Sequence, residues 1–141
     1  MPRTALLRTL SYRNARRWSK TVVSGGEPHA DAIRAFALRF PAAREDHPFG
    51  PDAHVFKVGD GSTMFAILGD GPPVTVTLKL TREEREVALE LPFVSEARYV
   101  GRYGWVTASI EDEPAFDAVC EWIRESYWLK APKDLRESAW S

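Results

Sequence analysis

The nitrogen and sulfur donors of this 141-residue chain that suit a transition-metal ion are few, three histidines and one cysteine. Its three histidines, His29, His47 and His54, show no ligand-type spacing. The single cysteine, Cys120, excludes an internal disulfide and a multi-cysteine metal site. Because a dedicated transition-metal site needs several converging nitrogen or sulfur donors, the sequence predicts no metal and no cofactor.

Residues suited to nucleophilic or phosphate chemistry are equally sparse. Cys120 and Ser126 lie in no sequence signature of an activated nucleophile. The two Gly-Asp-Gly segments, 59–61 and 69–71, precede no helix and lack the Lys-Ser/Thr of a P-loop, so we interpret them as hairpin turns. We therefore predict a protein that is not an enzyme; a small-molecule enzyme without a recognisable motif is the least favoured alternative.

One group of polar and aromatic residues forms a candidate binding surface. Alternation in segments 74–80 and 105–110 places hydroxyls, a lysine and Trp105 on the sheet face opposite the core. Aromatic rings can stack on bases, while hydroxyls and lysine can contact phosphates. The alternative is that Trp105 is covered and only packs. The candidate ligand face, with the bases beside it, comprises Lys57, Thr75, Thr77, Lys79, Arg98, Arg102, Trp105, Thr107 and Ser109.

The charge is unevenly distributed along the chain. Residues 1–26, a basic N-terminal leader, carry six bases and no acid, whereas residues 27–141 carry 13 bases and all 20 acids, a net charge of −7. Clustered bases attract a polyanion by displacing its counterions, so the leader is the segment whose bulk charge favours DNA. Its candidate polyanion contacts are Arg8, Arg13, Arg16, Arg17 and Lys20.

Composition and pattern indicate a single α+β domain over residues 27–141. Hydrophobic content of 44% and charged content of 28% are ordinary for a soluble domain, and no apolar run is long enough for a membrane span. One cysteine favours a reduced, cytoplasmic setting. We expect a five-stranded, mainly antiparallel sheet with helices packed on one face. The expected order α-β-β-β-α-β-β-α comprises helix 29–40, loop 41–53, strands 54–58, 63–68 and 74–80, helix 81–91, strands 98–100 and 105–110, and helix 114–127.

Periodicity also predicts which side chains form the core. In segment 74–80, Val76 and Leu78 should be buried, while Thr75, Thr77 and Lys79 point to the opposite face. The helices contribute apolar stripes with the i, i+3, i+4, i+7 pattern. The predicted core residues are Ile33, Phe36, Phe40, Val76, Leu78, Val106, Ile110, Phe116, Cys120 and Ile123.

An ordered series of short motifs resembles the MmcQ/YjbR family of small bacterial proteins over residues 32–136. The motifs are Phe65-Ala66, Leu78-Lys79, Tyr99 followed by Trp105-Val106, Ser126-Tyr127 and Pro132-Lys133-Asp134-Leu135-Arg136. The resemblance implies a "double-wing" fold related to frataxin (CyaY-like) and a role in DNA binding. Frataxin-like proteins hold iron with an acidic first helix, but here that helix offers only Asp31.

The family's usual lysine before the aromatic strand is replaced by Thr63 in this chain, or is displaced by one position. The first functional hypothesis is a non-catalytic binding protein with DNA as the partner that the resemblance implies. The alternative is a protein–protein interaction module that uses the open sheet face with Trp105 as its aromatic anchor. The sequence does not specify the oligomeric state.

Overall fold

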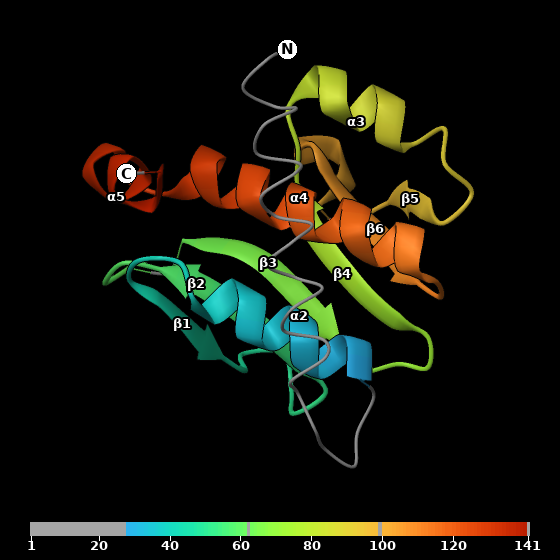
Figure 1. Cartoon of the computed structure of the whole chain (residues 1–141), viewed down its shortest axis with the longest axis horizontal. Helices are drawn as coiled ribbons and strands as arrows, with labels where there is room; N and C mark the ends of the chain where they lie inside the picture. The colour runs from blue at the N-terminus through green and yellow to red at the C-terminus, as the bar shows by residue number, and fades with distance from the viewer. Residues whose placement is uncertain (1–27, 62, 99, 141) are drawn as a thin grey trace.

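The computed structural model describes residues 28–61, 63–98 and 100–140. Its elements are α2 (Pro28–Leu38), β1 (Ala43–Asp46), β2 (Ala53–Val58), β3 (Met64–Gly69), β4 (Val74–Lys79), α3 (Arg82–Ala88), β5 (Val94–Glu96), the 3-10 turn η1 (Gly101–Tyr103), β6 (Trp105–Ile110), α4 (Glu113–Lys130) and α5 (Lys133–Trp140). In these ranges the strands form one antiparallel sheet in the order β1-β2-β3-β4-β6-β5. Helices α2 and α4 cover one face of it (Figure 1). The α+β class is confirmed, but this part of the chain has six strands and not the predicted five.

The core lies between this sheet face and the apolar stripes of α2 and α4. In β4, Val76 and Leu78 are fully buried, whereas Thr75, Thr77 and Lys79 are partly exposed on the other face. A slip of one residue would invert this pattern, so the predicted register is confirmed. All ten predicted core residues are buried: Ile33, Phe36, Phe40, Val76, Leu78, Val106, Ile110, Phe116, Cys120 and Ile123.

The additional strand is β1, which occupies part of the segment predicted to be a loop, residues 41–53. β1 lies at the edge of the sheet and pairs only with β2. Its sequence, Ala-Arg-Glu-Asp, has no hydrophobic alternation, because an edge strand can keep polar side chains on both faces. The chain turns into β1 at Ala42, whose φ of 59° is left-handed.

The other edge strand also differs from the prediction. The predicted strand at residues 98–100 is not observed at its two described residues: Arg98 and Val100 lie in a turn, and the Val100 N–H donates to the Arg98 carbonyl at 2.6 Å. The edge strand is β5, and its one buried residue, Val94, pairs with Ala108 of β6. A three-residue strand with a single apolar side chain is too short for a period of two to be recognised.

The helix after β4 begins as predicted. The Thr81 hydroxyl accepts the Glu84 N–H at 3.2 Å, which caps the first turn of α3. The helix ends at Ala88, earlier than the predicted Leu91, because the Leu91 N–H turns back to the Ala88 carbonyl at 2.9 Å. Helix α5 follows α4 and was not part of the predicted order.

A β-bulge in β3 shapes the core. Phe56 pairs with Ala66, but the next residue, Lys57, pairs with Met64, so Phe65 is the extra residue on β3. A bulge breaks the alternation of side chains at one point. Phe65 and Ala66 are accordingly both fully buried although they are neighbours in a strand.

Ser126 and Tyr127 fasten α4 to the sheet. The buried Ser126 hydroxyl donates to the Phe65 carbonyl at 2.6 Å and accepts the Lys79 N–H at 3.0 Å, so it joins β3 to β4. The Tyr127 hydroxyl donates to the Pro41 carbonyl at 2.8 Å, next to the chain's entry into β1. The two Ser126 bonds therefore engage backbone groups at the bulge of β3 and at the end of β4.

The predicted basic leader, residues 1–26, lies outside the described residues, as do its candidate contacts Arg8, Arg13, Arg16, Arg17 and Lys20. Tyr99 lies outside them as well. In the described part of the chain, no helix combines the length and the apolar character needed to cross a membrane.

Candidate functional site

The sheet face opposite α2 and α4, called the outer face here, contains the hydroxyl residues of the predicted ligand face. Strand pairing places Thr75 opposite Ser109 and Thr77 opposite Thr107. The Thr77 and Thr107 hydroxyls lie 2.8 Å apart and hydrogen-bond to each other. The structure therefore brings these four residues together as predicted, but two of their hydroxyls satisfy one another.

Trp105 does not form an exposed platform on this face. It pairs with Lys79 at the start of β6, and only 5% of it is exposed. The chain closes around this position, because the Leu80 N–H bonds to the Gly104 carbonyl and the Ala97 N–H bonds to the Trp105 carbonyl, each at 3.2 Å. The prediction of an accessible aromatic anchor at Trp105 is therefore wrong, and the alternative that it only packs is the one observed.

A groove of about 750 Å³ lies on the outer face. Its walls are mostly apolar, and Phe49, from the β1–β2 connection, is 65% exposed beside it. The sequence analysis missed Phe49, Met64 and Ile67; the available signal was that segment 64–68 is apolar at every position, which is typical of a strand covered on both faces. The lining residues are Phe49, Met64, Ile67, Thr77, Ser95, Glu96, Arg98, Val100 and Thr107.

The predicted bases do not gather into one positive patch. The Lys57 ammonium lies 2.8 Å from the Asp46 carboxylate, and this hydrogen bond lowers the pKa of Asp46. Arg102 is exposed, with its guanidinium 4.9 Å from the centroid of the Tyr103 ring. Arg98 lines the groove together with the acid Glu96. The charges on this face are therefore mixed.

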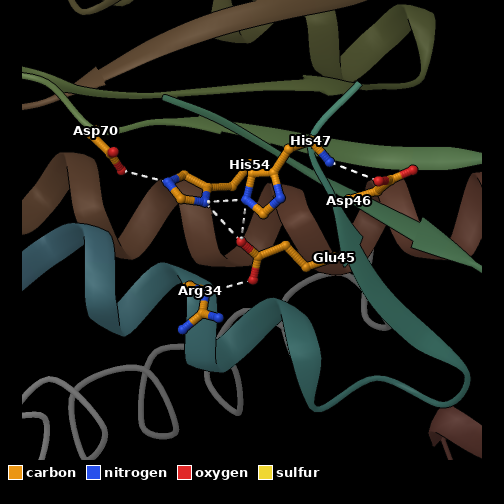
Figure 2. A network of polar contacts seen from close by, with 6 residues as sticks. All are labelled: Arg34, Glu45, Asp46, His47, His54 and Asp70. Carbon is orange, nitrogen blue, oxygen red and sulfur yellow. Dashed lines mark hydrogen bonds and ion pairs between the residues drawn. The ribbon is translucent and has the colours of Figure 1, made fainter. Parts of the chain in front are cut away.

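A second, polar pocket of about 520 Å³ lies between α2 and the β1–β2 hairpin. Here the fold brings together two histidines that are separated in sequence: His47 Nε2 lies 3.1 Å from His54 Nδ1. Both nitrogens approach one carboxylate oxygen, Glu45 Oε2, at 2.9 and 2.7 Å (Figure 2). The expectation that His47 and His54 do not converge is wrong.

Hairpin geometry explains the convergence. Strands β1 and β2 are antiparallel, so Glu45, which pairs with Phe56, lies near His54 at the start of β2. His47 follows β1 directly, at the beginning of the connection that returns to β2. The third histidine, His29, is separate from this pocket and stacks on Phe116 at 5.1 Å between ring centroids.

Two groups beside this cluster, the Asp70 carboxylate and the Arg34 guanidinium, shift the pKa values of His54 and Glu45. Asp70 Oδ1 lies 2.7 Å from His54 Nε2, and Arg34 Nε lies 2.5 Å from Glu45 Oε1. Burial disfavours the charged His54 ring, but the hydrogen bonds to Glu45 and Asp70 outweigh it and raise the pKa of His54. Burial likewise disfavours the Glu45 carboxylate, yet hydrogen bonds from His54 and Arg34 lower its pKa.

Neither candidate nucleophile is accessible. Cys120 is fully buried, and burial raises the pKa of its thiol well above the ordinary value, which disfavours the reactive thiolate. Ser126 is fully buried, and its hydroxyl is committed to two backbone groups. Both residues therefore serve packing and hydrogen bonding.

The YjbR family model matches residues 38–129, which span the sheet and most of α4. The chain belongs to the YjbR family. Its fold is similar to that of a Deinococcus radiodurans protein with a DUF419 domain, with a TM-score of 0.67 and 24% identity over 77% of this chain and 86% of that one. A Pseudomonas syringae protein of known structure is similar with a TM-score of 0.57 and 20% identity over 70% and 95% of the two chains. These two similarities show the fold alone, and no curated protein matches the chain.

Four of the residues on which the YjbR resemblance rests, Phe65, Lys79, Trp105 and Ser126, meet at one structural junction. Phe65 accepts a hydrogen bond from Ser126, and Ser126 accepts one from Lys79. Lys79 pairs in turn with Trp105. These four motif residues therefore describe how α4 is attached to β3 and β4 next to β6, and none of them lines either pocket.

Proposed function

We propose that this YjbR-family domain is a non-catalytic binding protein whose outer groove receives an apolar segment of a partner protein. The observation that supports it best is the groove itself, an open surface whose lining is mainly apolar. Exposed apolar surfaces rimmed by polar groups are typical of protein–protein contacts.

The details of the groove favour a large apolar side chain over a phosphate backbone. Met64 and Ile67 provide its apolar surface on β3, and the Thr77–Thr107 pair adds methyl groups while its hydroxyls bond to each other. Phe49 also lines the groove, and its side chain is largely exposed to solvent. An aromatic or aliphatic anchor could therefore displace water here without leaving a hydroxyl without a partner.

The rim can orient such a segment. Arg98 and Glu96 contribute opposite charges to the lining of the groove; Glu96 ends β5, and its carboxylate also lies 3.4 Å from the Arg85 guanidinium. β5 is an edge strand whose second side is unpaired in the described residues. An extended peptide could add its backbone there while its apolar side chain enters the groove.

An acidic substitution in the groove tests this proposal. We expect Ile67→Glu to weaken binding of apolar peptides at least tenfold, because a charge would have to lose water on contact. The probes are 12-residue peptides selected from a displayed random library on the full-length protein and measured by fluorescence anisotropy. Val87→Glu is the matched control, since Val87 is a 63% exposed aliphatic residue on α3. Equal affinities for both variants would contradict the proposal, as would selection of peptides without apolar anchors.

DNA binding is the second candidate function, favoured by the six bases without an acid in residues 1–26. We expect the full chain to bind duplex DNA weakly, with a Kd of about 10⁻⁴ to 10⁻⁶ M, and with strong dependence on salt. Changing the five leader bases Arg8, Arg13, Arg16, Arg17 and Lys20 to glutamine should remove most of this affinity in a titration of labelled duplex at two salt concentrations.

The matched control removes five exposed bases from the acidic body by changing Arg39, Arg82, Arg98, Arg102 and Lys133 to glutamine. We expect this control to bind DNA almost as the unmodified chain does. If the leader variant still bound DNA and the variant without the five body bases did not, the DNA would be bound by bases clustered on one surface of the body.

A further inference from the structure

The polar pocket beside α2 is separate from the proposed peptide groove, and the two share no lining residue. Three ligand-type atoms, Glu45 Oε2, His47 Nε2 and His54 Nδ1, lie 2.7, 2.9 and 3.1 Å from one another. We infer that these three side chains form a binding site for one divalent transition-metal ion of the Zn²⁺ and Ni²⁺ class.

The spacing of the three atoms suits a common ion. Ligand atoms about 2.1 Å from an ion and at right angles to one another are separated by about 3 Å, and in a tetrahedral site by about 3.4 Å. The observed triangle is close to the first value and needs only a small expansion to reach the second. One face of the ion would be held by protein, and water would complete its coordination from the pocket.

Each of two ligands has a partner that holds it in a ligating orientation. Asp70 Oδ1 lies 2.7 Å from His54 Nε2, so an Nε2–H can donate to Asp70, and Nδ1 is the ring nitrogen that faces Glu45 and His47. Arg34 binds Glu45 through Oε1, the oxygen that does not face the histidines. Such outer partners are a regular feature of metal sites, because they fix the tautomer and direction of each ligand.

The donor set and the access determine the class of ion. Two imidazoles and one carboxylate suit zinc, nickel, cobalt or iron(II), whereas magnesium and calcium prefer sites made of oxygen ligands. His47 is 44% exposed at the mouth of the pocket, so an ion can reach the cluster from solvent. His54 Nδ1 and Glu45 Oε2 lie 2.7 Å apart, and a bound ion would take the place of a proton shared between them and release it to solvent.

The second Gly-Asp-Gly turn positions Asp70 against His54. Residues 69–71 connect β3 to β4, and the turn directs the Asp70 carboxylate at the start of β2. The first such turn, residues 59–61, has no acid in this pocket. The two turns are alike in sequence, but only the second contributes to the cluster within the described residues.

The test is metal binding by the full-length protein without an affinity tag, freed of metal by dialysis against a chelator. Isothermal titration with Zn²⁺ should show one ion per chain, and Zn²⁺ should raise the Tm, because an ion bound only by the native state stabilises it. Co²⁺ should give a visible absorption band that reports the ligand geometry. Residues 1–26 contain no His, Cys, Asp or Glu, so they offer no side chain of this kind.

Variants separate this site from adventitious binding. His47→Ala and Glu45→Gln should abolish the titration signal, and Asp70→Asn should weaken Zn²⁺ binding by about 10–100-fold, since Asp70 acts through His54. His29→Asn, a histidine outside the pocket, should bind Zn²⁺ as the unmodified chain does. Because His47 is in an exposed connection, its variant should keep the metal-free Tm. No uptake of Zn²⁺ or Co²⁺, or uptake unchanged by His47→Ala, would overturn the inference.

Discussion

Replacing Tyr127 by alanine is expected to lower the free energy of unfolding by about 3–5 kcal/mol, as for other large aromatic residues removed from a core. Tyr127 is fully buried, its ring stacks on Phe40 at 4.7 Å between centroids, and it meets Phe65 edge-on at 5.3 Å. These three rings come from α4, the chain after α2, and β3, so the substitution opens a cavity where the layers meet. Guanidinium denaturation followed by circular dichroism measures the loss.

Tyr127→Phe is the matched control. It keeps the ring and removes only the hydrogen bond from the hydroxyl to the Pro41 carbonyl, so we expect a loss of about 1 kcal/mol. The difference between the two variants isolates the aromatic packing. If alanine were no more harmful than phenylalanine, the three rings could not be packed as the structure places them.

Ser126→Ala is expected to destabilise the protein by about 1–3 kcal/mol although it removes a single oxygen atom. The substitution leaves the Phe65 carbonyl and the Lys79 N–H without their side-chain partner, next to a fully buried helix position. An unsatisfied buried polar group costs more than an average hydrogen bond contributes, because water cannot replace the lost partner. The same denaturation experiment measures it.

Ser109→Ala on the outer face is the control for Ser126. Ser109 is partly exposed and lies on the opposite side of the sheet from α4, so water can replace any bond that it loses. We expect a change within about 0.5 kcal/mol, as for surface substitutions in general. Equal losses at the two positions would show that the Ser126 bonds contribute no more than an exposed hydroxyl does.

The two proposed sites can be tested independently because they lie on opposite faces of the sheet. The groove is on the outer face, at Met64, Ile67 and the Thr77–Thr107 pair. The histidine cluster faces α2. Ile67→Glu should therefore leave Zn²⁺ binding unchanged, and His47→Ala should leave peptide binding unchanged. A substitution that affected both ligands would indicate a general loss of structure.

Most of the fold could be predicted because a periodic pattern that extends over a whole strand or helix reflects the burial of one of its faces. The alternation in β4 and the apolar stripe of α4 each follow from one face being removed from water. The edge strands β1 and β5 escaped prediction for the same reason: they are short, mostly polar and paired on one side only, so burial imposes little pattern on them. Helix α5 was not predicted either; it begins at Lys133, in the short segment that follows α4.

The family could be predicted from the ordered series of short motifs. The class of fold, the core residues and the register of β4 could be predicted from periodicity, since they depend on the regular burial of neighbouring side chains. Alternation also predicted the correct face for Trp105, but the burial of Trp105 is visible only in the folded chain, because alternation assigns a face and not what lies over it. Convergence of Glu45, His47, His54 and Asp70 was likewise decided by the tertiary structure. Their contacts depend on how one hairpin and one turn meet in space, and no local spacing encodes that meeting.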